Sequence, residues 1–132
     1  MTIKQRTPEE ISTRQIITQA LAAAQLLTED FIEKYQDLID WKWISMNQPL
    51  TEAFIEKHKD QVDWEDISFH QPLTEAFMER HQDQVDWKQI SGRQELSEAF
   101  IEKHEDLVDW GWISECQHLS EDFIERHQDL LG

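Results

Sequence analysis

The chain has 132 residues, a length that suits one domain, and its 28 acidic and 12 basic side chains give a net charge of −16. Such a charge disfavours direct binding to DNA, RNA or an anionic membrane, and favours basic proteins as partners. A single cysteine, Cys116, excludes an internal disulfide, and no apolar run approaches the roughly 20 residues of a membrane span. We therefore expect a cytoplasmic protein.

The first segment, residues 1–26, predicts one amphipathic helix. It contains Thr7-Pro8-Glu9-Glu10, a capping box with proline at the first helical position. Apolar side chains follow at helical spacing, at Ile11, Ile16, Ile17, Ala20, Leu21 and Ala24. We expect this segment to cover the open end of the segment that follows.

Residues 27–132 repeat one 23-residue unit, which reads approximately L-S/T-E-x-F-I/M-E-K/R-x-x-D-x-V/I/L-D-W-x-x-I-S-x-x-Q-x. The units begin at Leu27, Leu50, Leu73, Leu96 and Leu119, and the fifth is truncated at Gly132. A unit this short cannot bury its apolar residues alone, so the units must stack. The sequence predicts an all-α, right-handed helical-repeat solenoid of alternating long and short helices, with 1–26 as an N-terminal capping helix and 27–132 as a single solenoid domain.

Helix boundaries can be read within one unit. Thr51 is a candidate N-cap for a long first helix, and Asp63 is a candidate N-cap for a second helix of six to eight residues that opens with Trp64. Pro49 and Pro72 help to end second helices, because proline cannot continue a helix. We expect the repeated tryptophans to lie in the core. The repeated Ser and Gln columns should satisfy helix-end carbonyls and form hydrogen bonds between units.

Acidic residues recur at three positions of each first helix, four residues apart, on the face opposite the apolar one. These three acidic columns are Glu29, Glu52, Glu75, Glu98 and Glu121; Glu33, Glu56, Glu79, Glu102 and Glu125; and Asp37, Asp60, Asp83, Asp106 and Asp129. They predict a wall of fifteen carboxylates that is either a solvated face or an imitation of nucleic-acid phosphates. The second interpretation requires that neighbouring lysines and arginines leave these carboxylates unpaired and exposed.

Catalytic and metal-binding motifs are not found. The chain contains no HExxH motif, no phosphate-binding glycine loop and no EF-hand, and strict repetition argues against a single active site. One column holds Tyr35, His58, His81, His104 and His127, but one ring per unit is too sparse for a tetrahedral metal site. We expect this column to pack in the interior. We predict a protein that is not an enzyme and has neither cofactor nor metal.

The repeated pattern of Leu-Ser/Thr-Glu, Phe, and Asp-Trp followed by Ile-Ser resembles short tandem repeats in uncharacterised proteins of bacteriophages and large DNA viruses, over residues 27–132. The alternation of helices is also similar to leucine-rich-repeat-variant solenoids. A viral resemblance implies an inhibitor of host defence, of the kind that blocks restriction enzymes or CRISPR effectors.

Two functions follow from these observations. The leading hypothesis is an acidic module whose fifteen carboxylates dock into the basic nucleic-acid groove of a host enzyme. The alternative is a scaffold or adaptor that binds a protein or peptide through Trp or His groups of its other wall. Trp43 and Trp112 are either packing residues, which we favour, or exposed anchors at an interface. Leu130 and Leu131 also suggest a homodimer through the C-terminal end.

Overall fold

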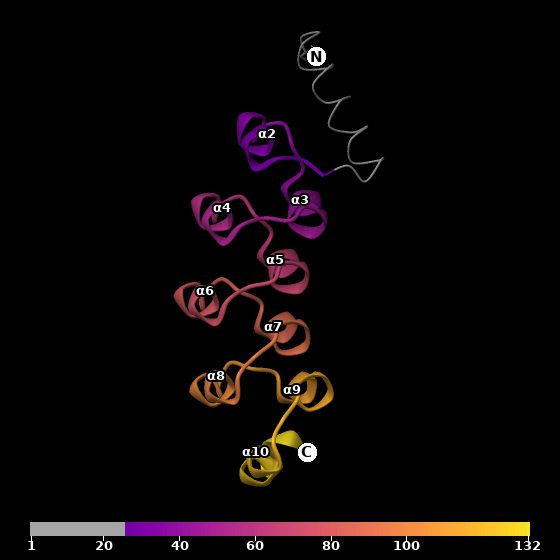
Figure 1. Ribbon diagram of the computed structural model, residues 1–132, viewed down its shortest axis with the longest axis vertical. Helices are drawn as coiled ribbons and strands as arrows, with labels where there is room; N and C mark the ends of the chain where they lie inside the picture. The colour runs from indigo at the N-terminus through magenta and orange to yellow at the C-terminus, as the bar shows by residue number, and fades with distance from the viewer. Residues whose placement is uncertain (1–25) are drawn as a thin grey trace, which may run out of the picture.

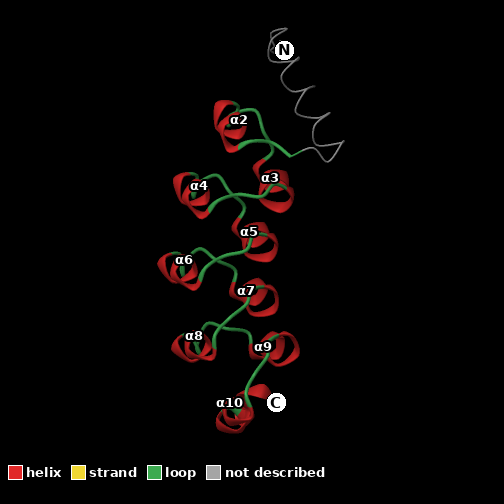
Figure 2. Ribbon diagram, viewed as in Figure 1, coloured by secondary structure: helices red, strands yellow, loops and turns green. Residues whose placement is uncertain are grey.

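The computed structural model describes residues 26–132, and its regular secondary structure there is helical, without a strand (Figure 2). Each complete unit contributes two short helices. The first helices are α2 (Glu29–Lys34), α4 (Glu52–Lys57), α6 (Glu75–Arg80), α8 (Glu98–Lys103) and α10 (Glu121–Arg126). The second helices are α3 (Trp41–Asn47), α5 (Trp64–His70), α7 (Trp87–Arg93) and α9 (Trp110–Cys116), and α11 (Gln128–Leu131) follows α10.

Every first helix begins at the predicted Thr or Ser. The Thr51 hydroxyl accepts a hydrogen bond from the Phe54 N–H at 3.2 Å, and the same bond recurs in each of the other units. The second helices begin at the predicted aspartate, since Asp63 accepts from the Asp66 N–H at 3.1 Å. These caps occupy N–H groups that the helix itself leaves unpaired.

The helix lengths correct the expected alternation of long and short helices. The first helices have six residues and the second helices have seven. α4 ends at Lys57, because His58 adopts φ −109° and ψ 30°, outside the helical region. The His58 ring lies against the rings of Trp41 and Phe54, which also stack on each other. One separate turn follows, in which the Val62 N–H donates to the His58 carbonyl at 3.1 Å.

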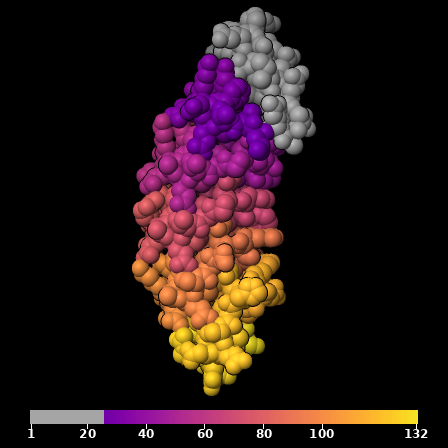
Figure 3. Space-filling view, viewed as in Figure 1, coloured from indigo at the N-terminus to yellow at the C-terminus, as the bar shows by residue number. Residues whose placement is uncertain are grey.

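The helices form two layers that run along the molecule, with α2, α4, α6 and α8 in one and α3, α5, α7 and α9 in the other (Figure 1). Successive second helices pack directly on one another. Each unit crosses the elongated molecule as a band beside the units that precede and follow it in the chain (Figure 3). This arrangement is the predicted repeat solenoid.

The core is a column of equivalent apolar side chains between the layers. In the second unit Phe54, Ile55, Val62 and Ile67 are buried, and their counterparts in the third and fourth units are buried as well. The expected capping helix over 1–26 lies outside the described residues, apart from Leu26. Among the helices that the structure describes, none is long and apolar enough to cross a membrane.

Candidate protein-binding surfaces

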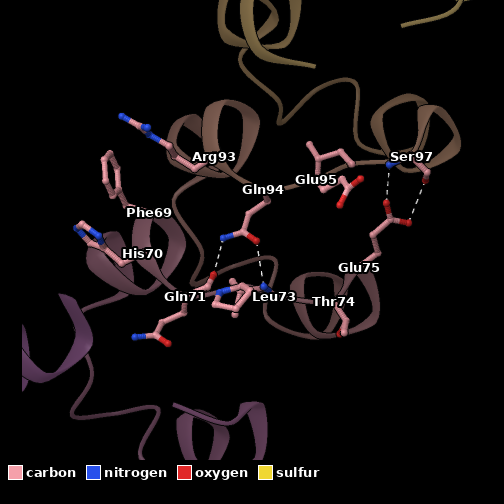
Figure 4. A pocket seen from close by; sticks show the side chains of 12 residues that line it. Phe69, His70, Gln71, Leu73, Thr74, Glu75, Arg93, Gln94, Glu95 and Ser97 are labelled. Carbon is pink, nitrogen blue, oxygen red and sulfur yellow. Dashed lines mark hydrogen bonds between the residues drawn. The ribbon is translucent and has the colours of Figure 1, made fainter. Parts of the chain in front are cut away.

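The first acidic column binds the helix N-terminus of the next unit. Glu52 accepts hydrogen bonds from the Thr74 backbone N–H at 2.6 Å and from its hydroxyl at 3.0 Å. Glu29, Glu75 and Glu98 bind the N-cap residue of the unit after their own in the same way, and Figure 4 shows the pair formed by Glu75 and Ser97. These four carboxylates join successive units.

The second acidic column forms ion pairs with bases of the next unit. These pairs are Glu33 with Lys57, Glu56 with Arg80, Glu79 with Lys103 and Glu102 with Arg126. The Lys57 ammonium hydrogen-bonds to Glu33 and lowers the pKa of that carboxyl, and Lys103 does the same to the pKa of Glu79. Hydrogen bonds from His127 and then Arg126 lower the pKa of Glu102. Neighbouring bases therefore neutralise four of the predicted carboxylates.

Seven carboxylates of the predicted wall remain, and all are exposed: Asp37, Asp60, Asp83, Asp106, Glu121, Glu125 and Asp129. Within residues 26–132, none of them forms an ion pair. The structure thus divides the fifteen predicted site residues into eight that hold units together and seven that face solvent. The expected helix face did not reveal this division, because the partners of the eight lie 22 to 24 residues further along the chain. The expectation was also wrong for Asp37, Asp60, Asp83 and Asp106, which lie in the turns that follow the first helices and not on those helices.

In the histidine column His58, His81 and His104 are buried, as predicted for a packing role, while Tyr35 and His127 at its two ends are half-buried. The His81 ring lies 5.3 Å from the Trp64 ring and 4.5 Å from the Phe77 ring, and its Nδ1 is 2.8 Å from the Gln84 side-chain oxygen. Its Nε2 is buried without a hydrogen bond, 3.6 Å from Glu56. In the described part of the chain, no group of three or more His, Cys, Asp or Glu side chains could hold a metal ion.

The Gln and Ser columns link the units, as expected. The Gln94 amide donates to the Gln71 carbonyl at 2.7 Å, while its oxygen accepts from the Leu73 N–H at 3.0 Å (Figure 4). The same amide donates to the Ser68 carbonyl at 2.9 Å. The Ser68 hydroxyl accepts from the Asp86 N–H at 2.9 Å. These bonds satisfy buried backbone groups at every junction.

The residues that differ from unit to unit gather on the second helices. We define the second-helix wall as four positions in each of α3, α5, α7 and α9. They are the second, third, sixth and seventh residues of the helix, which share one helix face. These positions hold Lys42, Trp43, Met46 and Asn47; Glu65, Asp66, Phe69 and His70; Lys88, Gln89, Gly92 and Arg93; and Gly111, Trp112, Glu115 and Cys116. Most are exposed or half-buried. A comparison of the units with one another could have found this surface from the sequence, but only Trp43 and Trp112 were singled out there.

Neighbouring residues of the wall interact across the junctions. The Lys42 ammonium donates to the Asp66 carboxylate of the next unit at 2.7 Å, which raises the pKa of Lys42. The Arg93 guanidinium lies over the Phe69 ring, 4.1 Å from its centroid. The Trp112 indole ring lies so close to Gly92 that a Cβ atom at position 92 would be only 3.2 Å from it.

Two hollows open beside the pair formed by Phe69 and Arg93. The smaller hollow, of about 220 Å³, is lined by Phe69, Lys88, Gln89, Gly92, Arg93 and Trp112. The larger hollow, of about 830 Å³, follows the junction between the second and third complete units, and Figure 4 shows the side chains around it. Its lining includes the same Phe69 and Arg93 together with Pro72, Glu95 and Leu96. The wall therefore offers concave, partly aromatic surface near its centre.

Comparison of the chain with known protein families, with curated proteins and with solved structures finds no match. The resemblance to viral repeats stays a prediction.

Proposed function

We propose that the chain is a non-enzymatic protein-binding module that recognises its partner through the second-helix wall. The observation that carries this proposal is the separation of two kinds of residue. Most columns that recur in the units, apart from the exposed column of Asp37, Asp60, Asp83, Asp106 and Asp129, hold the units together. Most of the residues that differ between units gather on one face of α3, α5, α7 and α9.

Specific recognition requires a surface that is not the same in every unit. Repeated residues such as Glu52, Gln71 and Ser68 already have partners within the solenoid. The second-helix wall differs from unit to unit, as specific recognition requires. It also contains Phe69 and Trp112, aromatic residues of the kind that anchor protein interfaces. Trp112 is 38% exposed, so part of its ring is open to a partner.

Imitation of nucleic-acid charge is the second candidate function. In that case the partner is a basic nucleic-acid-binding enzyme of a host, and the chain acts as an anti-CRISPR or anti-restriction inhibitor. What favours it is the row of exposed, unpaired aspartates that includes Asp60, Asp83 and Asp106, within repeats that carry 26 acidic and 9 basic side chains. Eight of the fifteen carboxylates are bound to the next unit, so only seven remain to imitate nucleic-acid phosphates.

Two variants separate these functions. The wall variant combines Phe69→Met, Lys88→Glu and Trp112→Gln, which place residues that other units already carry in those columns. The acid variant combines Asp60→Asn, Asp83→Asn and Asp106→Asn, which leaves every ion pair intact. Both should keep their helical circular dichroism.

Capture of partners from a host-cell lysate at low and high salt, with and without competing DNA, gives the readout. We expect the wall variant to lose a partner that the acid variant keeps. Loss in the acid variant alone, with displacement by DNA and by salt, would replace the proposal with charge imitation.

A further inference from the structure

We infer that the small hollow between Phe69 and Trp112 binds one apolar side chain of a partner peptide, with a neighbouring carboxylate of that peptide placed against Lys88 and Arg93. This inference rests on the proposed function and names the chemistry of the partner at the centre of the second-helix wall.

The decisive observation is a replacement at one junction. Lys42 pairs with Asp66, which stands at the second wall position of the next unit. Lys88 is the counterpart of Lys42 two units later, but the residue corresponding to Asp66 is Trp112. The internal carboxylate is thus exchanged for an indole ring, and both Lys88 and Trp112 line the hollow.

The two bases of the hollow have no carboxylate partner in residues 26–132. Lys88 is exposed and forms no ion pair there, even with Asp109, the counterpart of the Asp63 that lies 3.6 Å from Lys42. Arg93 also forms no ion pair within this part of the chain and instead lies over Phe69. By contrast, Lys57, Arg80, Lys103 and Arg126 are all paired. In a chain of charge −16, unpaired positive charge beside a concave apolar surface favours a carboxylate from outside.

The volume of the hollow limits how large an apolar group of the ligand it can hold. A volume of about 220 Å³ is smaller than the roughly 300–1,000 Å³ of small-molecule pockets, and it suits a single side chain. Phe69 and Trp112 supply aromatic sides, and Gly92 contributes no side chain that would fill the space. An aromatic or large aliphatic residue next to Asp or Glu therefore matches the hollow in both shape and charge.

The test is a selection of peptides on the whole chain. A display library of random 12-residue peptides is selected on the unmodified protein and depleted on the Trp112→Asp variant. That variant recreates at Lys88 the pairing that Lys42 already makes with Asp66, and it removes the indole ring from the side of the hollow. It therefore disables both parts of the site with a pair of residues that the fold already accommodates. We expect enriched peptides to carry Asp or Glu within two residues of an aromatic or large aliphatic residue.

Labelled enriched peptides are then titrated against single variants. Affinity should fall at least tenfold in Trp112→Asp and in Lys88→Glu, and it should not change in Lys59→Glu, which makes the same charge change at an exposed position outside the wall. Glu is tolerated at both positions, because other units carry Glu65 and Glu105 there.

The outcomes also separate the inference from the proposed function. Enrichment of basic peptides, no enrichment, or binding that survives Trp112→Asp would overturn the inference. If the lysate partner is nevertheless lost by the triple wall variant, the proposed function stands without this ligand chemistry. If neither peptides nor the partner respond to changes in the wall, both fail.

Discussion

Glu52 accepts two hydrogen bonds from Thr74, the N-cap residue of the first helix one unit further along the chain. A glutamate that would be taken for surface charge on α4 is therefore bound to the N-terminus of α6, the first helix of the next unit. The same relationship joins Glu29, Glu75 and Glu98 to the units that follow them. These four glutamates therefore contribute to the negative charge of the chain and also hold successive units together.

Removal of this bridge should destabilise the solenoid. We expect Glu52→Ala to lower the free energy of unfolding by about 1 kcal/mol, because the Thr74 N–H and hydroxyl lose a charged acceptor. Glu121→Ala is the matched control, since Glu121 makes no such bond in the described segment. Urea unfolding followed by circular dichroism measures both. Equal effects of the two substitutions would mean that the bridge does not join the units.

The ion pairs predict loss of stability in acid. The pKa values of Glu33, Glu79 and Glu102 are lowered in the folded chain. Their contribution is therefore complete above the ordinary glutamate pKa and is lost as the pH falls through the lowered values. Melting temperatures between pH 7 and pH 3 should be insensitive to these groups at first and then decrease.

A base variant tests the cause of this pH dependence. Lys57→Met removes the hydrogen bond that contributes most to the lowered Glu33 pKa, so that pKa should rise toward its ordinary value. Carbon NMR titration of the side-chain carboxyl measures it. A Glu33 pKa that is the same with and without the lysine would show that another group is responsible.

The histidine column should respond to truncation as a core column does. His81→Ala removes a buried ring that lies against Trp64 and Phe77, and we expect the free energy of unfolding to fall by about 2–4 kcal/mol. His118→Ala alters an exposed ring and should change stability by less than about 0.5 kcal/mol. A small effect of His81→Ala in thermal unfolding would argue against the packing role.

Burial by neighbouring units can be tested within one column. Ile101 is fully buried, whereas Ile124, at the same position of the last unit, is 46% exposed. Ile101→Ala should cost about 2–5 kcal/mol and Ile124→Ala less than about 1 kcal/mol, because only the first substitution leaves a cavity. Denaturant titration of both variants gives the comparison. If Ile124→Ala costs as much as Ile101→Ala, a partner or a second copy covers that end in solution.

Local features of the fold could be predicted from the sequence. Thr51 and Asp63 were placed as N-caps because a hydroxyl or carboxylate there reaches N–H groups only two or three residues away. The second-helix length and the stacking of units followed from the repeat itself. The early end of the first helix could not be predicted in this way, because His58 leaves the helical conformation where its ring contacts Trp41 and Phe54, and Trp41 belongs to the preceding unit.

The sequence by itself determined the repeat and its caps, since each depends on residues within one unit and recurs with them. It also marked the apolar columns, which the stacking of neighbouring units then buries. Only the tertiary structure decided which charges are available. Glu33 and Glu52 meet their partners across a junction between units, and Lys88 lacks one because Trp112 stands where Asp66 stands two units earlier. Such pairings depend on how adjacent units lie against each other, which a spacing along a single helix does not contain.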